Sequence, residues 1–327
     1  MTFRERCGER SQRKNVQKIK CMKKTYHLCL SAGDEVMFRD QEDFNRGFNC
    51  FALALYKTDS NGLVETFMFN HAHLMIETRD PYGFMHAFRQ PYSKFFNYKY
   101  HRAGLLGEEK HFQLETVGLY HKLAAASYVL RNALHHGIAP IPYAYRNSSV
   151  NVIFQKEMGK VPSDKLLPEK SYYRFIGKRA EYPSRYRMHE SGIFLRESVL
   201  DVVQVENMFM TPRTFDYYMT RKSGEEWYKE QEKDKLGSPP VGLECIEKGV
   251  NLHTIEKMMA FESGRANYRM MLDSDIFHMI DHEILPRYGK PSVYTLDKWE
   301  KNEIGEMLYR QFHIGERQIR RCLAMLY

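Results

Sequence analysis

The chain has 327 residues, a length that predicts more than one domain. Hydrophobic residues make up 43% and aromatic residues 13%, which excludes a disordered chain and predicts globular cores. The six cysteines form no Cys-x-x-Cys pair, which argues against a zinc module or a disulfide framework. No apolar run reaches the roughly 18 residues of a membrane span, and the first residues contain no apolar signal core. We therefore expect a soluble protein of the cytoplasm.

The net charge of +8 is concentrated at one end of the sequence. Residues 1–24 hold nine Lys and Arg against two Glu, so this arm carries +7 of the total. Basic arms of this kind bind polyanions by releasing counterions, and nucleic acid is the commonest such partner. A solvated tail that aids solubility fits the same composition equally well. Both interpretations of the arm stay open.

Alternating strands and helices are predicted after the arm. "TYHLCL" is typical of a strand. Apolar residues then recur at helical spacing over 40–56, with Asp40 as the N-cap. The segments "LVETFMFN" and "HAHLMIET" follow the turn "SNG" and are predicted to be two adjacent strands.

The next elements complete a β-α-β-β-α-β-α order. Asp80 and Pro81 are typical of a helix start, and Pro91 should kink or split that helix. "KHFQLET" predicts a short strand, and a long helix over 119–136 should end at Gly137. This order predicts an α+β fold for residues 25–150, with helices packed on one antiparallel sheet.

The sequence changes character beyond residue 150. Residues 151–190 are polar and punctuated by proline, which predicts a linker or a loop-rich join, and residues 191–327 are predicted to be mainly helical. Two helices joined by the short turn "HIG" match a helix-turn-helix over 296–326. A plain helical hairpin with a basic exposed face would show the same pattern. In the helix-turn-helix interpretation the second helix binds DNA through Arg317, Gln318, Arg320 and Arg321.

Two histidines separated by one residue stand in the segment "FMFNHAHLMIET". Residues i and i+2 of a strand point to the same face, so His71 and His73 should direct two imidazoles toward one place. Taken alone, such a pair is more often structural than metal-binding. It gains weight only if a third ligand and a reactive group lie nearby.

The helix over 119–136 offers both groups. Tyr128 and Asn132 are four residues apart and therefore share one helix face. Two neutral imidazoles and an amide oxygen would bind a metal and leave positions open for substrate oxygens. Without a thiolate, the predicted ion is Mg²⁺ or Mn²⁺, which would polarise a phosphodiester for attack by the tyrosine. A half-buried tyrosine beside a polar neighbour is the structural alternative.

Four segments together resemble one family. "MFNHAHL" resembles the "M-P-N-H-v-H-L" segment of single-tyrosine HUH transposases, which include insertion-sequence transposases and the REP-associated tyrosine transposases. "YVLRNALHHGI" resembles the family's "Y-I-x-x-N-P-v-x-x-G-l" segment, "AFRQPYSKFFNYKYHRAG" its "S-Y-x-x-y-f-N-x-r-y-x-R-x-G" helix, and "YRNSS" its closing "y-p-x-S-S". Their order and spacing agree over about residues 24–150. Phe69, Ala72 and Ala133 depart from the family pattern without removing a catalytic group.

The resemblance implies an HUH endonuclease domain of ferredoxin-like or RRM-like topology. It implies metal-dependent cleavage and rejoining of single-stranded DNA, often at hairpin or palindromic ends, through a 5′-phosphotyrosine. Carried over by position, Tyr128 is the nucleophile, and His71, His73 and Asn132 hold the metal. We expect an active, nucleoid-associated enzyme of prokaryotic type, and a homodimer is compatible with the family.

The helix after Asp80 is predicted to contact the DNA. Its basic side chains interleave with aromatic ones, a combination that suits phosphates and stacked bases. Arg89, Asn97 and Arg102 are the predicted contacts. Two other functions stay open: a domesticated, non-catalytic DNA-binding regulator, and a phosphoesterase that uses water and leaves Tyr128 dispensable.

Overall fold

Residues 24–135 build one antiparallel sheet with helices on both faces. The computed structural model describes residues 22–33, 35–160, 165–220, 224–234, 261–262, 265–266 and 271–325, so the predicted basic arm lies almost entirely outside the described residues. The elements follow the predicted order: β1 (Lys24–Ser31), α1 (Gln41–Lys57), β2 (Asn61–Phe67), β3 (His71–Thr78), α2 (Pro81–Tyr100), β4 (Phe112–Glu115) and α3 (Leu119–His135). The predicted α+β class is confirmed.

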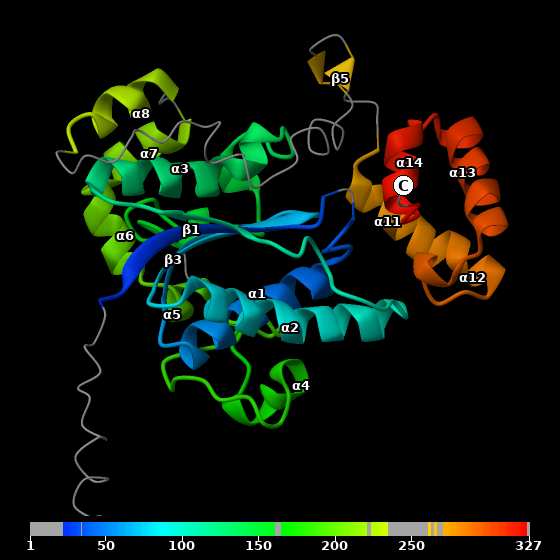
Figure 1. The fold of residues 1–327 in the computed structure, drawn as a ribbon, viewed down its shortest axis with the longest axis horizontal. Coiled ribbons are helices and arrows are strands. Elements are labelled where there is room, and N and C mark those ends of the chain that lie inside the picture. Colours follow the sequence, from blue (N-terminus) through cyan, green and yellow to red (C-terminus); the bar gives the residue numbers. More distant parts are fainter. Residues whose placement is uncertain are drawn as a thin grey trace, which may run out of the picture.

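The sheet has the strand order β2-β3-β1-β4, and each neighbouring pair is antiparallel. β3 lies between β1 and β2, which α1 connects, so the first half of the domain is a split β-α-β unit. In Figure 1, α1 and α2 cover one face of the sheet and α3 covers the other. The sheet is therefore buried on both sides.

Alternate residues of the central strands enter two different cores. Leu28, Leu74 and Ile76 pack with the aromatic side chains of α1 and α2. Met75 instead packs with α3. Because side chains alternate along a strand, the odd-numbered residues of β3, including both histidines, face α3.

Both predicted helix caps of the first two helices are present. The Asp40 carboxylate accepts a hydrogen bond from the backbone N–H of Asp43, and the Asp80 carboxylate accepts one from Gly83. The expectation that Pro91 splits α2 is wrong, because the helix runs unbroken from Pro81 to Tyr100. Pro91 lies on the exposed face, while a buried apolar stripe holds the helix against α1 on both sides of it: Phe84, Phe88, Tyr92 and Phe96.

The described part of the chain after residue 150 is mainly helical beyond residue 190, as predicted. Its first helices are α4 (Tyr173–Ile176), α5 (Arg196–Val199), α6 (Val202–Phe209), α7 (Pro212–Thr220) and α8 (Gly224–Gln231). A two-stranded ribbon follows, β5 (Phe261–Glu262) and β6 (Arg265–Ala266), and then α11 (Asp273–Met279), a π-helical turn (Ile280–Ile284), α12 (Leu285–Tyr288), α13 (Lys298–Phe312) and α14 (Glu316–Cys322). None of the helices in the described part of the chain combines the length and apolar character needed to cross a bilayer.

Two groups of these later helices, α6 to α8 and α11 to α14, lie at opposite ends of the molecule (Figure 1). α6 and α7 share a core with α3. The helices from α11 to α14 build a core of their own around Ile276, Ile280, Leu308 and Ile319. The loop-rich stretch predicted over 151–190 contributes Tyr172 and Met188 to the core of α1 and α2, so it packs against the sheet domain.

One buried arginine joins the C-terminal helices to the sheet domain. Arg39 precedes α1, and its guanidinium forms an ion pair with Asp281 at 2.8 Å and donates a hydrogen bond to the carbonyl of Cys322 at 3.2 Å. The same guanidinium lies 4.6 Å from the ring centre of Phe277. The Asp281 carboxylate holds the pKa of Arg39 above its ordinary value. The two parts therefore share a charged contact that is shielded from water.

Candidate active site

Strand β3 and helix α3 bring the four predicted catalytic residues together. The rings of Tyr128 and His73 are 5.2 Å apart and edge-on, and Asn132 Oδ1 lies 2.9 Å from His71 Nε2. Four residues of helix rise about 6 Å, and two residues of strand rise about 6.6 Å. An i, i+4 pair on a helix can therefore match an i, i+2 pair on an antiparallel strand. This match is what aligns Tyr128 with His73 and Asn132 with His71.

His71 is held in one tautomer by the residue before it. Asn70 Nδ2 donates to the carbonyl of Gly33 at 2.7 Å, so Asn70 Oδ1 faces the ring and accepts from His71 Nδ1 at 2.8 Å. Burial lowers the pKa of His71 to about 4, so the ring is neutral at pH 7. With its one proton on Nδ1, His71 presents a lone pair at Nε2, directly opposite Asn132 Oδ1.

This pair of atoms fits a divalent cation. Two ligand atoms about 2.1 Å from one ion and at right angles to each other lie about 3.0 Å apart. The observed 2.9 Å between His71 Nε2 and Asn132 Oδ1 agrees with that separation. Turning the amide of Asn132 would instead let Nδ2 donate to His71, so a metal-binding measurement decides between the two arrangements.

His27 supports the second histidine from the neighbouring strand. Cys29 lies opposite His73 in the β1–β3 register, and His27 is two residues from Cys29 on the same face. His27 Nε2 and His73 Nδ1 are 2.9 Å apart in fully buried surroundings. Burial lowers the pKa of His27 to about 3 and holds that of His73 well below its ordinary value. Both rings are therefore neutral at pH 7, and a single proton lies between His27 Nε2 and His73 Nδ1.

The position of that proton decides whether His73 can bind a metal. If His73 Nδ1 donates to His27 Nε2, His73 Nε2 carries a lone pair. That nitrogen is buried and has no hydrogen-bond partner among the residues that the structure describes. Metal-binding histidines characteristically donate their second ring N–H to a hydrogen-bond acceptor, and His27 Nε2 would be that acceptor for His73 Nδ1. His73 therefore fits as the third ligand beside His71 and Asn132.

The four side chains are buried: His71, His73, Tyr128 and Asn132 are each 0% exposed. In the described residues, no group of three or more His, Cys, Asp or Glu side chains is arranged to hold a metal, and the candidate set differs because an amide supplies one ligand. A phosphodiester can reach Tyr128 only if a covering segment moves aside.

Sequence reasoning missed three neighbours of this site: His27, Asn70 and His136. The ring of His136 lies 5.6 Å from that of His71 and edge-on to it. The sequence spacing could have identified His136, because residues 128, 132 and 136 recur every four positions and so share one helix face. His27 shares its strand parity with Cys29 and Ser31, a polar alternation opposite the apolar Leu28 and Leu30.

The predicted DNA contacts on α2 have partners within the protein. The Arg89 guanidinium donates to the carbonyls of Leu106, Gly107 and Glu109. Asn97 donates to the carbonyl of Gly104, and Arg102 binds the Glu35 carboxylate at 2.5 and 2.8 Å. These contacts tie the loop after α2 to the helix. DNA binding by the three residues stays a prediction.

The C-terminal helical hairpin is present, but only half of its predicted contact residues reach the surface. α13 and α14 are joined by a turn in which His313 adopts the left-handed conformation. Gln318 and Arg321 are buried and bind the Asp273 carboxylate at 2.8 and 2.6 Å. Arg317 is exposed, and Arg320 lies 3.5 Å from Glu316 on the same helix. A DNA-binding role for α14 stays a prediction that depends on these last two.

Comparison with known proteins adds a weak structural likeness. No protein-family model matches the chain, and no curated protein matches its sequence. One similar chain among solved structures is described as "Structure of the REP associates tyrosine transposase bound to a REP hairpin". It is 8% identical, the match covers 45% of this chain and 87% of that chain, and the TM-score is 0.35. At that level the likeness carries no argument, and membership of the family stays a prediction.

Proposed function

We propose that this protein is a metal-dependent DNA strand transferase that cleaves and rejoins single-stranded DNA through a 5′-phosphotyrosine on Tyr128. The observation that carries the proposal is the alignment of Tyr128 and Asn132 with His73 and His71 across α3 and β3. The sequence motifs around these residues favour DNA as the substrate. Mg²⁺ or Mn²⁺ is the proposed cofactor.

Each residue has a separate task in this proposal. His71 Nε2, His73 Nε2 and Asn132 Oδ1 would hold the ion. When bound, the ion polarises the phosphodiester and offsets charge on the leaving 3′ oxygen. Asn70 and His27 fix the orientation and proton position of the two histidines.

Tyr128 supplies the nucleophile. Its oxygen bonds to phosphorus while the bond from phosphorus to the 3′ oxygen breaks, so the 5′ phosphate stays on the protein. The proton lost by the phenol equals the proton gained by the released 3′ hydroxyl. Because the phosphotyrosine bond conserves the energy of the broken bond, the reverse attack rejoins the strand without ATP.

The complete burial of the four side chains favours a second candidate, a non-catalytic DNA-binding regulator. Such a protein would retain the fold and the basic surfaces without admitting a phosphodiester to Tyr128. The two candidates differ in one measurable product, a covalent protein–DNA adduct.

The test incubates the full chain with fluorescent single-stranded hairpin oligonucleotides and Mn²⁺ or Mg²⁺, followed by denaturing electrophoresis. We expect an adduct that survives boiling in detergent, that requires the metal, and that Tyr128→Phe abolishes. Tyr120→Phe is the matched control, because Tyr120 lies on the same helix two turns away and should keep full activity. Absence of adducts with every hairpin and metal would support the regulator. Cleavage by Tyr128→Phe would show that water is the nucleophile.

A further inference from the structure

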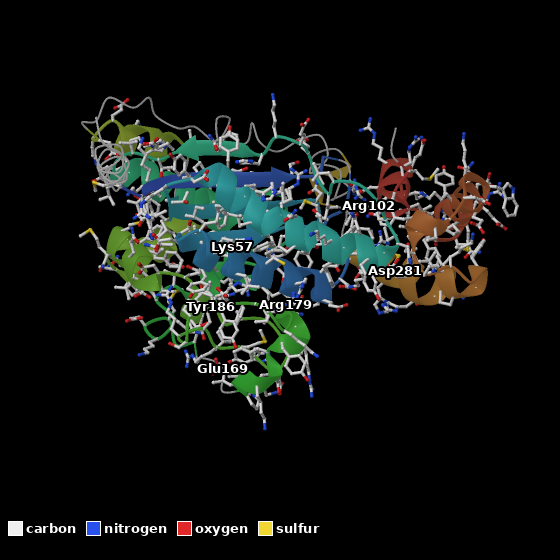
Figure 2. All side chains as sticks on the ribbon, turned by 60° about the horizontal axis from the view of Figure 1, so that its bottom comes forward. Lys57, Arg102, Glu169, Arg179, Tyr186 and Asp281 are labelled. Carbon is white, nitrogen blue, oxygen red and sulfur yellow. The ribbon has the colours of Figure 1, made fainter. Side chains whose placement is uncertain are left out.

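A basic cavity lies on the side of the molecule that α3 does not cover. It has a volume of about 770 Å³ and is enclosed by the end of α1, the turn before β2 and the loop 179–186. Figure 2 shows Lys57, Arg179 and Tyr186, which all line it, close together where α1 meets that loop. The cavity is separated from Tyr128 by the thickness of the sheet. The proposed function does not use it.

Beyond the N-terminal arm, positive charge is concentrated in the sequence segment that supplies one wall of this cavity. Residues 1–24 carry +7 of the total net charge of +8, so only +1 is left for the remaining residues. Within those, residues 165–190 hold seven Lys and Arg and three Glu, a balance of +4. The rest of the chain beyond the arm is therefore net negative. A positive segment on a negative body is a local electrostatic feature that attracts polyanions.

The cavity's cations are available to a ligand. Lys57, Arg179 and Arg185 are exposed, and within the described part of the chain no ion pair involves any of them. Two acidic residues, Asp59 and Glu181, also line the cavity, so its three cations exceed its carboxylates by one. Asp59 is already paired with Lys23 at 3.1 Å and with Arg79 at 2.6 Å, two cations that do not line the cavity. Hydrogen bonds from Arg79 and Lys23 lower the pKa of Asp59, so it stays ionised and paired.

Aromatic side chains lie beside these cations. Tyr56 lines the cavity and is 46% exposed. The Arg185 guanidinium lies 5.7 Å from the ring centre of Tyr186, which is buried against α1. Cations for phosphates beside a free aromatic face for bases are the combination used to bind single-stranded nucleic acid.

We propose that this cavity binds the sugar-phosphate backbone of single-stranded nucleic acid, with Lys57, Arg179 and Arg185 on phosphates and Tyr56 stacked on a base. Its volume exceeds the space that one inorganic phosphate needs. Because the cavity and Tyr128 lie on opposite faces of the sheet, the segment bound here differs from any segment held at Tyr128. The binding therefore requires neither a metal nor Tyr128.

The test measures fluorescence anisotropy of a labelled single-stranded oligonucleotide of about 20 nucleotides with the full chain in EDTA, over a range of salt concentrations. The cavity variant is Arg179→Glu with Arg185→Glu. The control variant is Lys156→Glu with Arg287→Glu, two exposed cations that do not line the cavity and that give the same change in net charge. Circular dichroism checks that both variants fold.

We expect the cavity variant to lose about tenfold in affinity, and the slope of log K against log salt to become shallower by about 1.4, or 0.7 for each lost phosphate contact. The control should change affinity by less than about threefold. Tyr56→Ala, whose exposed side chain supports no core, should weaken binding about fivefold. Tyr128→Phe should bind like the wild type.

Three results would overturn the proposal. One is an unchanged affinity and salt slope in the cavity variant. Another is an equal loss in the control, which would assign the effect to net charge alone. The last is displacement of the oligonucleotide by polyglutamate of equal charge as effectively as by unlabelled single-stranded DNA, which would assign the surface to an acidic protein partner.

Discussion

The two faces of the sheet use the same strands for opposite purposes. Toward α1 and α2, the strands present Leu28, Leu74 and Ile76 to a core built from stacked and edge-on phenylalanines. Toward α3, alternate positions of the same strands present His27, His71 and His73. Apolar burial stabilises the first face. The second face buries polar groups, which cost free energy unless they are paired.

Small residues on α3 allow this helix to pack close to the polar side chains of the second face. Ala124 and Ala125 are buried on the face of α3 that carries Tyr128, and they take little room between helix and sheet. They allow the helix axis to approach the strands, so that Tyr128 and Asn132 one to two turns later reach the histidines. The comparison therefore predicts that substitutions on the two faces separate stability from metal binding.

The largest expected effect is on metal binding. His71→Ala and His73→Ala should each weaken Mn²⁺ binding at least about 100-fold, because each removes a ligand. Isothermal titration calorimetry measures this without any DNA. Cys29→Ala is the control, since Cys29 lies opposite His73 on the same face and is not a proposed ligand. Wild-type affinity in both histidine variants would show that no metal binds between α3 and β3.

On the other face the expected effect is on folding. Phe67 is 1% exposed, and its ring meets those of Phe38, Phe51 and Phe88 edge-on. Phe67→Ala should lower the free energy of unfolding by about 3–5 kcal/mol in urea denaturation. Tyr128→Phe, which keeps the ring, should lower it by about 1 kcal/mol or less. A similar loss in both variants would remove the distinction between the faces.

Substitutions of His27 test whether metal binding and folding stability change separately at a single residue. His27→Leu should weaken Mn²⁺ binding by about 10–100-fold, because His73 loses the acceptor that fixes its proton on Nδ1. Folding stability should stay the same or rise, since an apolar side chain replaces a buried polar one. His27→Gln should restore part of the affinity, because its amide oxygen can accept the same hydrogen bond. Equal affinities in His27→Leu and His27→Gln would contradict this positioning role.

The remaining expected effect is a pH dependence of the metal-free protein. Burial lowers the pKa of His27 to about 3 and that of His71 to about 4 in the folded state, below the value near 6.5 of an unfolded chain. The unfolded state therefore binds more protons between these limits. Stability should be complete above about pH 6.5 and fall as the pH approaches 4, by about 1.4 kcal/mol per pH unit for each histidine.

Urea denaturation in EDTA at several pH values measures this slope. His71→Gln should make it shallower, because it removes one of the histidines whose pKa is lowered by burial. A stability that does not change between pH 7 and pH 5 would show that these rings are already charged or are exposed in the folded protein.

Local sequence signals were enough to predict the order of the secondary-structure elements and to bring forward the four side chains of the candidate site. Asp40 and Asp80 cap their helices as expected, and strand alternation correctly placed His71 and His73 on one face. His27 could not be found this way, because its approach to His73 depends on the register between β1 and β3, which alternation does not set.

The charged residues were harder to interpret from sequence. A helical arginine has the same spacing whether it faces water or a set of carbonyls. Arg89 donates to three backbone carbonyls, and Arg321 pairs with the buried Asp273, a residue 48 positions earlier in the chain. Such partners become visible only when distant segments are placed together.

The contact of Arg39 has a consequence for cooperativity. Its guanidinium is fully shielded, and two of its partners, Asp281 and the carbonyl of Cys322, belong to helices that follow it by more than 240 residues. If those helices opened while the sheet stayed folded, Arg39 would lose its counter-charge at a site with little water. That penalty links the two parts, so the sheet domain and the C-terminal helices should unfold in one transition.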